Sequence, residues 1–119
     1  EEVVSYSSDK NNSVSLEPNI YYVMKTIEKV NTPDDIVILF RPRSTLYRSG
    51  IALFTGNVSP GYIGELNFGI MNLRNEPFVL EMGARVCHAM FYQVVGETAA
   101  YRGQWQGGRT TTDGKEKQV

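Results

Sequence analysis

Residues 41–48, RPRSTLYR, combine side chains that are suited to binding an anionic group. Three arginines and two hydroxyl-bearing side chains follow directly after a short apolar run. A guanidinium offers forked N–H donors that match phosphate oxygens, and each hydroxyl adds a further donor. Taken alone, the segment has an equally good interpretation as a solvated basic loop, so it needs support from other features.

Residues 58–65, VSPGYIGE, have the composition of a tight hairpin that presents an aromatic ring. Pro60 and Gly61 favour a sharp turn, and Tyr62 follows directly. An aromatic ring at such a turn can stack under a sugar or a base. When this segment is taken alone, a plain hairpin with a packed tyrosine is the favoured interpretation.

The elements that must position these two segments have the patterns of strands. Runs rich in β-branched and aromatic residues, separated by Gly, Pro, Asn and Asp, occur at residues 14–16, 20–30, 36–40, 50–55, 65–73, 77–80 and 84–95. A helix is an alternative for residues 21–30, but their β-branched and aromatic content favours a strand. Many short strands predict an all-β domain, either a barrel or a sandwich.

The 119 residues suit one domain with a real core. Residues 1–13 are polar and predict a flexible lead-in, whereas residues 14–96 carry the strand patterns. Residues 97–119 are rich in Gly and Thr and end in charged side chains, which predicts a mobile C-terminal arm.

Composition argues against several classes of protein. The formal net charge is -1, whereas nucleic-acid binding needs an excess of Lys and Arg. Cys87 is the single cysteine, so neither an internal disulfide nor a thiolate zinc site is expected. No secretory signal and no apolar run of about 18 residues is visible. We therefore expect a cytoplasmic protein that contacts neither nucleic acid nor membrane.

Four segments taken together, in order and with this spacing, are far more specific than any of them alone. RPRSTLYRSGI, GNVSPGYIGELNFGIMNL, LEMGARVCHAMF and YRGQWQGGR resemble the dUTPase and dCTP deaminase family from about Leu16 to Arg109. The resemblance implies a distorted, jelly-roll-like β-barrel that assembles as a homotrimer, with active sites between subunits. It also implies a Mg²⁺ ion that bridges the nucleotide phosphates and has few direct protein ligands.

The resemblance assigns roles to individual residues. The arginine–serine box, defined as Arg43, Ser44, Thr45 and Arg48, would hold the phosphates, and Gly61 and Tyr62 would shape the sugar and base pocket. The C-terminal arm would close the site, with the residues that match the family's arm being Tyr101, Gln104, Trp105, Gln106 and Arg109. The sequence around Trp105 is more similar to the deaminase branch, although Gln104 stands where deaminases have a lysine.

Both catalytic acids of the family are missing. Ser59 stands where dUTPases carry the aspartate that orients water, and Gly69 stands where dCTP deaminases carry a proton-shuttling glutamate. A serine is no general base near neutral pH without a partner, and a glycine has no side chain. Glu65 is a weak replacement candidate, because a surface-strand carboxylate is its favoured interpretation.

Two further side chains have alternative interpretations. His88 replaces a family glutamine that helps to hold phosphate, and a cationic imidazole can donate from either nitrogen. The favoured interpretation of His88 is a core or interface histidine. Cys87 is interpreted as a small buried residue rather than a nucleophile, because nothing in the sequence pairs it with a base.

The sequence therefore predicts a protein that binds a deoxynucleoside triphosphate, with its activity in doubt. One version is an active dUTP diphosphatase in which Glu65, or a residue before Glu1, takes the role of the aspartate. The other version, which the missing acids favour, is a non-catalytic nucleotide sensor or a trimer that contacts another protein. A purely structural trimer is the weakest alternative.

Overall fold

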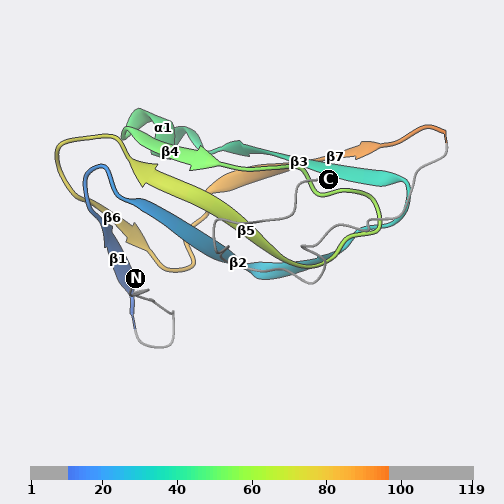
Figure 1. Cartoon of the computed structure of the whole chain (residues 1–119), viewed down its shortest axis with the longest axis horizontal. Coiled ribbons are helices and arrows are strands. Elements are labelled where there is room, and N and C mark those ends of the chain that lie inside the picture. The colour runs from blue at the N-terminus through green and yellow to red at the C-terminus, as the bar shows by residue number, and fades with distance from the viewer. Residues whose placement is uncertain (1–10, 97–119) are drawn as a thin grey trace, which may run out of the picture.

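The computed structural model describes residues 11–96. In this part the elements follow as β1 (Ser13–Leu16), β2 (Tyr21–Asn31), β3 (Ile36–Pro42), α1 (Ser44–Arg48), β4 (Ile51–Phe54), β5 (Ile63–Asn72), β6 (Phe78–Glu81) and β7 (Cys87–Gln93) (Figure 1). The first strand begins one residue before the predicted start at 14. The C-terminal arm and most of the lead-in lie outside the described residues.

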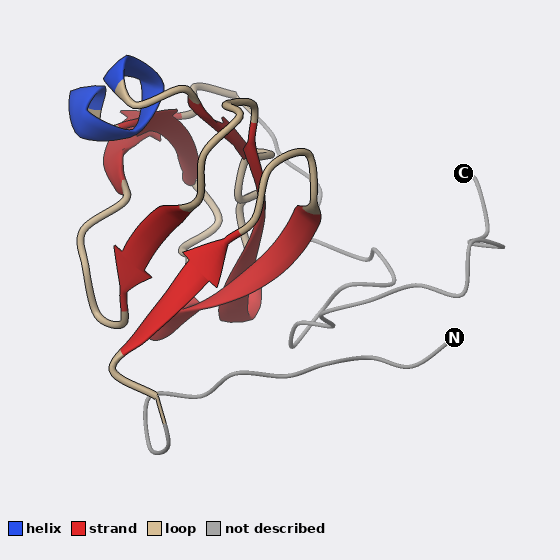
Figure 2. Cartoon of the chain, turned by 90° about the vertical axis from the view of Figure 1, so that its left-hand side faces the viewer, coloured by secondary structure: helices blue, strands red, loops and turns tan. Residues whose placement is uncertain are grey.

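The strands pair antiparallel in three small sheets, with the orders β2-β5-β4, β1-β6 and β3-β7. Single bridges between Pro18 and Asn72 and between Ile38 and Val58 connect further segments. Figure 2 shows the strands around a common interior, with α1 at one corner. The prediction of an all-β domain is confirmed, although the hydrogen-bonded sheets of residues 11–96 do not close into one continuous barrel.

Strand β2 settles the alternative that the sequence left for residues 21–30, because it is extended throughout. Tyr22 and Met24 pack against the core, whereas Tyr21 and Val23 are exposed. This alternation is the period of two expected for a strand with one buried face. The outward face of β2 therefore carries apolar side chains as well as the inward face.

Two predicted segments differ most from the structure. Residues 41–48 are no simple loop, because β3 extends to Pro42 and Ser44–Arg48 form the short helix α1, fastened by the buried Leu46. The last strand is shorter than residues 84–95, since a turn containing Gly83 (φ 82°) precedes it. Within residues 11–96 no helix has the length and apolarity needed to cross a membrane.

The buried side chains form two clusters, one near α1 and one near the hairpin of residues 58–65. The first cluster contains Val14, Leu16, Leu46, Ile51, Ile70 and Val86. The second contains Ile38, Val58 and Tyr62. Full burial of one Leu, Ile or Val side chain stabilises a fold by about 1.5–3 kcal/mol. Both ends of the domain are therefore fixed by packing, with β5 running from one to the other.

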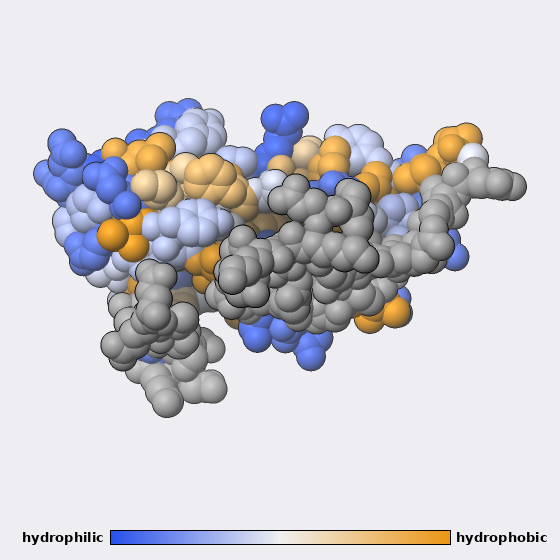
Figure 3. Space-filling view, in the orientation of Figure 1, coloured by the Kyte–Doolittle hydropathy of each residue, from blue (hydrophilic) through white to orange (hydrophobic). Residues whose placement is uncertain are grey.

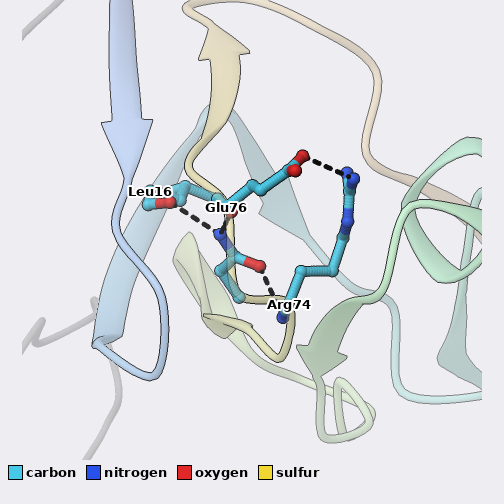
Figure 4. A network of polar contacts seen from close by, with 4 residues as sticks. Leu16, Arg74 and Glu76 are labelled. Carbon is cyan, nitrogen blue, oxygen red and sulfur yellow. Dashed lines mark hydrogen bonds and ion pairs between the residues drawn. The ribbon is translucent and has the colours of Figure 1, made fainter.

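Asn72 is the buried polar residue that joins three segments at the α1 end of β5. Its side-chain amide donates to the carbonyl oxygens of Leu16 at 2.8 Å and Glu76 at 2.7 Å, and its Oδ1 accepts from the Arg74 amide at 2.9 Å (Figure 4). All of these bonds are to main-chain groups, so Asn72 fixes the path of the backbone beside the first core cluster.

Candidate functional site

The arginine–serine box lies at the start of α1. Arg43 precedes the helix with an extended backbone (φ -67°, ψ 148°), and its carbonyl oxygen accepts from the Leu46 amide at 3.0 Å. Ser44, Thr45 and Arg48 are exposed. Because Ser44 and Arg48 are four residues apart in the helix, they share one face. The box therefore presents two hydroxyl groups and a guanidinium to solvent from a helix that is anchored in the core.

Arg43 is held by the segment that leads into β7. Its amide donates to the carbonyl oxygen of Val86 at 3.0 Å, and its Nη1 donates to that of Arg85 at 3.3 Å. Both acceptors are neutral, and no carboxylate pairs with this guanidinium among residues 11–96. The half-buried charge of Arg43 is thus positioned but not neutralised, which is suited to binding an anion.

The hairpin is built on a turn of the expected chemistry. The Tyr62 amide donates to the Ser59 carbonyl oxygen at 3.2 Å, and Gly61 has the positive φ of 81° that the third position of a type II turn requires. The Gly61 amide also donates to the carbonyl oxygen of Thr32 at 3.0 Å. The Pro-Gly pair therefore fixes the main chain of the hairpin and ties it to the end of β2.

Tyr62 itself is packed rather than displayed. Its side chain is 8% exposed, it packs in the second core cluster, and its hydroxyl donates to the Glu65 carbonyl oxygen at 2.6 Å. Within a single chain the plainer interpretation, a hairpin with a packed tyrosine, describes this ring. A role for Gly61 and Tyr62 in a sugar pocket stays a prediction.

The arginine–serine box and the hairpin lie near opposite ends of β5 (Figure 1). The hairpin runs directly into Ile63, whereas α1 packs beside β4, whose Ile51 pairs with Asn72 at the other end of β5. At the ordinary rise of a strand this places the two motifs roughly 20–30 Å apart. Side chains of the box therefore cannot touch the hairpin of the same chain.

The positions of the missing acids have different surroundings. Ser59 begins the turn of the hairpin, whereas Gly69 lies within β5, between Val23 of β2 and Phe54 of β4. The Glu65 carboxylate forms an ion pair with Lys25, with Oε2 3.2 Å from Nζ. Its pairing fits the surface-strand interpretation of Glu65.

Tyr21 is a residue of this region that the sequence analysis did not single out. A Cβ atom added to Gly69 would overlap the Tyr21 hydroxyl and lie 2.7 Å from both Cε1 and Cζ of the ring. The tyrosine ring therefore occupies the space that a side chain at position 69 would need. The sequence does show a glycine in one strand and several aromatic residues in another. Which aromatic ring lies over Gly69 depends on the register between β2 and β5, which the sequence does not show.

His88 is exposed on β7, directly opposite Arg41 of β3. This exposure contradicts a core position for His88, because its side chain alternates away from that of the packed neighbour Cys87. The alternative of an interface histidine stays a prediction. Arg41 also lines a cavity of about 490 Å³ together with Thr55 and Asn57. Two basic side chains thus lie at the end of β3 and directly after it, Arg41 and Arg43, and His88 lies opposite Arg41. A phosphate contact of His88 stays a prediction.

Cys87 is half-buried and packs against the first core cluster. Burial raises the pKa of its thiol, and the nearby Glu28 carboxylate raises that pKa further. A higher pKa means less thiolate, and the thiolate is the reactive form. This environment supports the interpretation of Cys87 as a packing residue.

Two remaining features concern metal ligands and the C-terminal arm. Among residues 11–96, no three His, Cys, Asp or Glu side chains come together as a metal site. The predicted arm residues lie outside the described residues; these are Tyr101, Gln104, Trp105, Gln106 and Arg109.

Comparisons with known proteins agree with the motifs. The model of a family described as dCTP deaminase-like matches residues 1–94. The chain is 34% identical over 90 residues to the probable deoxyuridine 5'-triphosphate nucleotidohydrolase of Methanopyrus kandleri, covering 76% of this chain and 58% of that protein. It is 31% identical over 112 residues to the dCTP deaminase of Pyrococcus furiosus, covering 93% of this chain and 72% of that protein.

A third relative has a name that combines the two activities. The dCTP deaminase, dUMP-forming, of Dictyoglomus turgidum is 35% identical over 91 residues, which cover 73% of this chain and 47% of that protein. The chain thus spans from about half to under three quarters of the length of these relatives. The sequence identity of this chain to the relative named for hydrolysis is about the same as its identity to those named for deamination. Sequence similarity therefore does not select one reaction.

Proposed function

The chain belongs to the dCTP deaminase-like family, and from this premise we propose that it binds a deoxynucleoside triphosphate. The family matches confirm the resemblance predicted from the motifs. The observation that carries the proposal is the arginine–serine box, whose half-buried Arg43 has no carboxylate partner among residues 11–96. Arg43, Ser44, Thr45 and Arg48 contact the phosphates, with His88 as a further donor and Mg²⁺ carried by the phosphates themselves.

The binding site is built between copies of the chain. The box and the hairpin are roughly 20–30 Å apart along β5 within one chain, so a site that uses both takes each from a different copy. A closed ring, a homotrimer, repeats the same contact around one axis. Exposed apolar side chains on β7 support an assembly, because Phe91 is 67% exposed and Val95, just beyond the strand, is 93% exposed. Figure 3 shows apolar surface in orange near the end of β7.

The protein binds its nucleotide without efficient turnover. Ser59 and Gly69 occupy the positions of the two family acids, and Glu65 is engaged with Lys25. Removal of a general base typically costs about 10²–10⁴-fold in rate. A sensor of nucleotide, or a trimer that contacts another protein, fits these residues better than an efficient dUTP diphosphatase or deaminase.

Calorimetric titration with Mg²⁺ and either dUTP or dCTP tests the binding proposal. Arg43→Ala should weaken binding by about tenfold or more, since a charge-assisted hydrogen bond contributes about 1.5–3 kcal/mol. Arg74→Ala is the matched control, because it removes an exposed arginine that pairs with Glu76. Equal affinity of Arg43→Ala and the unaltered protein, or no affinity for any nucleotide, would overturn the proposal.

A turnover assay separates binding from catalysis. The unaltered protein is incubated with dUTP or dCTP and Mg²⁺, and the products are resolved by chromatography. We expect no product above the uncatalysed background. Rapid formation of dUMP and pyrophosphate would instead establish an enzyme, and Glu65→Gln would then identify whether Glu65 serves as its base.

A further inference from the structure

Two basic side chains lie directly opposite each other where β3 and β7 pair. Arg41 of β3 and His88 of β7 are cross-strand partners, and both residues are exposed. Side chains that oppose each other in an antiparallel pair share one face of the sheet, and like charges in such a pair are destabilising. An anion bound by both side chains would remove this repulsion whenever the imidazole is protonated.

No acidic side chain compensates the charge of this pair in the part of the chain that the structure describes. Neither Arg41 nor His88 forms an ion pair with a carboxylate among residues 11–96. The Glu28 carboxylate lies near Cys87, but the side chains of Cys87 and His88 alternate to opposite faces of β7. The positive charge at Arg41 is thus left for a ligand to neutralise.

The register of β3 and β7 places this pair beside the arginine–serine box. The Arg43 amide donates to the Val86 carbonyl oxygen at 3.0 Å, so the pairing continues two positions beyond Arg41 and His88. The backbone of Arg43 is extended, so its side chain alternates to the same side as that of Arg41. The two Cα atoms are roughly 6–7 Å apart at the rise of a strand. A triphosphate chain can contact both arginines, whereas a single phosphate contacts one of them.

The cavity of about 490 Å³ beside Arg41 leaves open space on this face. Leu39 and Met90, the next cross-strand pair on the same face, line it together with the polar residues Thr55 and Asn57. The end of a polyanion at Arg41 therefore has room beside it and is not blocked by the fold.

We propose that Arg41 and His88 form an anion-binding pair that takes the end of the phosphate chain, with His88 protonated in the complex. This inference rests on the proposed function, in which the arginine–serine box contacts the rest of the chain. A bound anion favours the protonated imidazole, so binding takes up a proton. Affinity therefore rises as the pH falls through the range in which imidazole titrates. The pair determines specificity for a triphosphate over a monophosphate and makes binding dependent on pH.

Calorimetric titrations with dUTP, and displacement of dUTP by dUMP, test the role of Arg41. Arg41→Ala should weaken dUTP binding by roughly tenfold or more and reduce the preference for dUTP over dUMP, because one charge-assisted contact is lost. Arg74→Ala removes another exposed arginine and is the matched control, which should change neither quantity. Unchanged dUTP affinity in Arg41→Ala, or an equal loss for dUTP and dUMP, would overturn the inference.

The proton linkage is measured by titrating dUTP at about pH 6 and about pH 8, on either side of the imidazole range. Phosphate groups also titrate at about pH 6, so a variant must separate their contribution. His88→Gln keeps a hydrogen-bond donor but cannot titrate, and it should lose the gain in affinity that the unaltered protein shows at the lower pH. Titrations in two buffers of different ionisation enthalpy count the protons taken up. Equal proton uptake by the unaltered protein and His88→Gln would contradict the proposal.

These outcomes separate the inference from the proposed function. Suppose that dUTP affinity falls in Arg43→Ala but not in Arg41→Ala, and that His88→Gln takes up as many protons as the unaltered protein. The arginine–serine box would then be supported and the anion-binding pair overturned. No affinity for dUTP in the unaltered protein at either pH would overturn both.

Discussion

At one end of β5, near Asn72, α1 presents exposed hydroxyl groups and a guanidinium on a well-packed helix. The positions assigned to the family's acids hold Ser59, in the hairpin at the other end, and Gly69, within β5 itself. Both ends are firmly packed, so neither has lost its structure. The difference lies in chemistry, because the groups that we propose to bind phosphate are present, whereas neither position assigned to a family acid carries a carboxylate.

If the proposed phosphate site is correct, this contrast means that binding and catalysis depend on separate elements. The arginine–serine box lies on the short helix α1 and on the end of β3, where the buried Leu46 and the main-chain bonds of Arg43 fix it to the core. The acids would project from the hairpin and from the middle of β5. A serine at position 59 leaves the backbone of the hairpin in place, because Pro60, Gly61 and the main-chain bonds of the turn do not depend on a side chain there.

The largest expected effect comes from restoring an acid at the hairpin. If the remaining groups suit hydrolysis, Ser59→Asp should raise the rate of dUMP formation from dUTP by about 10²–10⁴-fold. Ser59→Asn has nearly the same shape without the charge and should give no increase. The rate is measured by pyrophosphate release; equal rates for the two variants would show that more than one acid is missing.

Restoring the other acid should need two changes. Gly69→Glu places its side chain against the Tyr21 ring, so the single variant should gain little deamination of dCTP. Gly69→Glu combined with Tyr21→Ala frees the space and should gain more, by about tenfold or more. A single variant as active as the double one, in an assay for ammonia release, would contradict the position assigned to Tyr21.

Asn72→Ala tests the α1 end of β5. The change removes three hydrogen bonds and leaves the Leu16 and Glu76 carbonyl oxygens without their donor, so we expect a loss of about 3–4 kcal/mol in the free energy of unfolding. Denaturant titration measures it. The exposed neighbour Asn75→Ala is the control and should change stability by less than about 0.5 kcal/mol. Similar values for both would show that the network stabilises little.

Tyr62→Phe tests the hairpin end by removing one hydroxyl. Loss of its 2.6 Å hydrogen bond to Glu65 should lower the free energy of unfolding by about 1 kcal/mol while the packed ring stays in place. Tyr92→Phe on the exposed face of β7 should have no measurable effect. A destabilisation as large as that of Asn72→Ala would mean that the single Tyr62 hydroxyl contributes as much stability as the three hydrogen bonds of Asn72.

The smallest expected effect concerns Cys87. Burial, with Glu28 as the second cause, raises the pKa of its thiol in the folded chain, so alkylation at neutral pH should be slower than in the unfolded chain. The unfolded thiol ionises at lower pH than the folded one. Stability from this group is therefore present below the ordinary thiol pKa and decreases as pH rises from there through the raised value. Faster alkylation in the folded state would contradict the assigned environment.

Much of the fold and the loss of the acids could be predicted from the sequence, because both depend on local patterns. The Pro60-Gly61 turn and the alternation in β5 need only neighbouring residues, and Ser59 and Gly69 are found by counting from the hairpin. The burial of Tyr62 and the position of Tyr21 over Gly69 could not be predicted. They depend on packing and register between segments far apart in the chain.

The separation of the two motifs was likewise beyond the sequence, since the box and the hairpin are close in the chain but lie near opposite ends of β5. The short helix α1 was missed because five residues give too little of a helical period to recognise. Local signals thus identify which residues matter, while the three-dimensional arrangement decides which of them can meet.

The most direct test of a site shared between copies mixes two defective variants. Arg43→Ala removes the phosphate contact, and Gly61→Ala strains the hairpin at its positive φ. Each variant alone should bind dUTP weakly, whereas oligomers refolded from an equal mixture should regain about one quarter of the full-affinity sites, as measured by calorimetric stoichiometry. If both variants co-assemble but the mixed oligomers contain no full-affinity sites, the result would contradict a site built from the box of one copy and the hairpin of another.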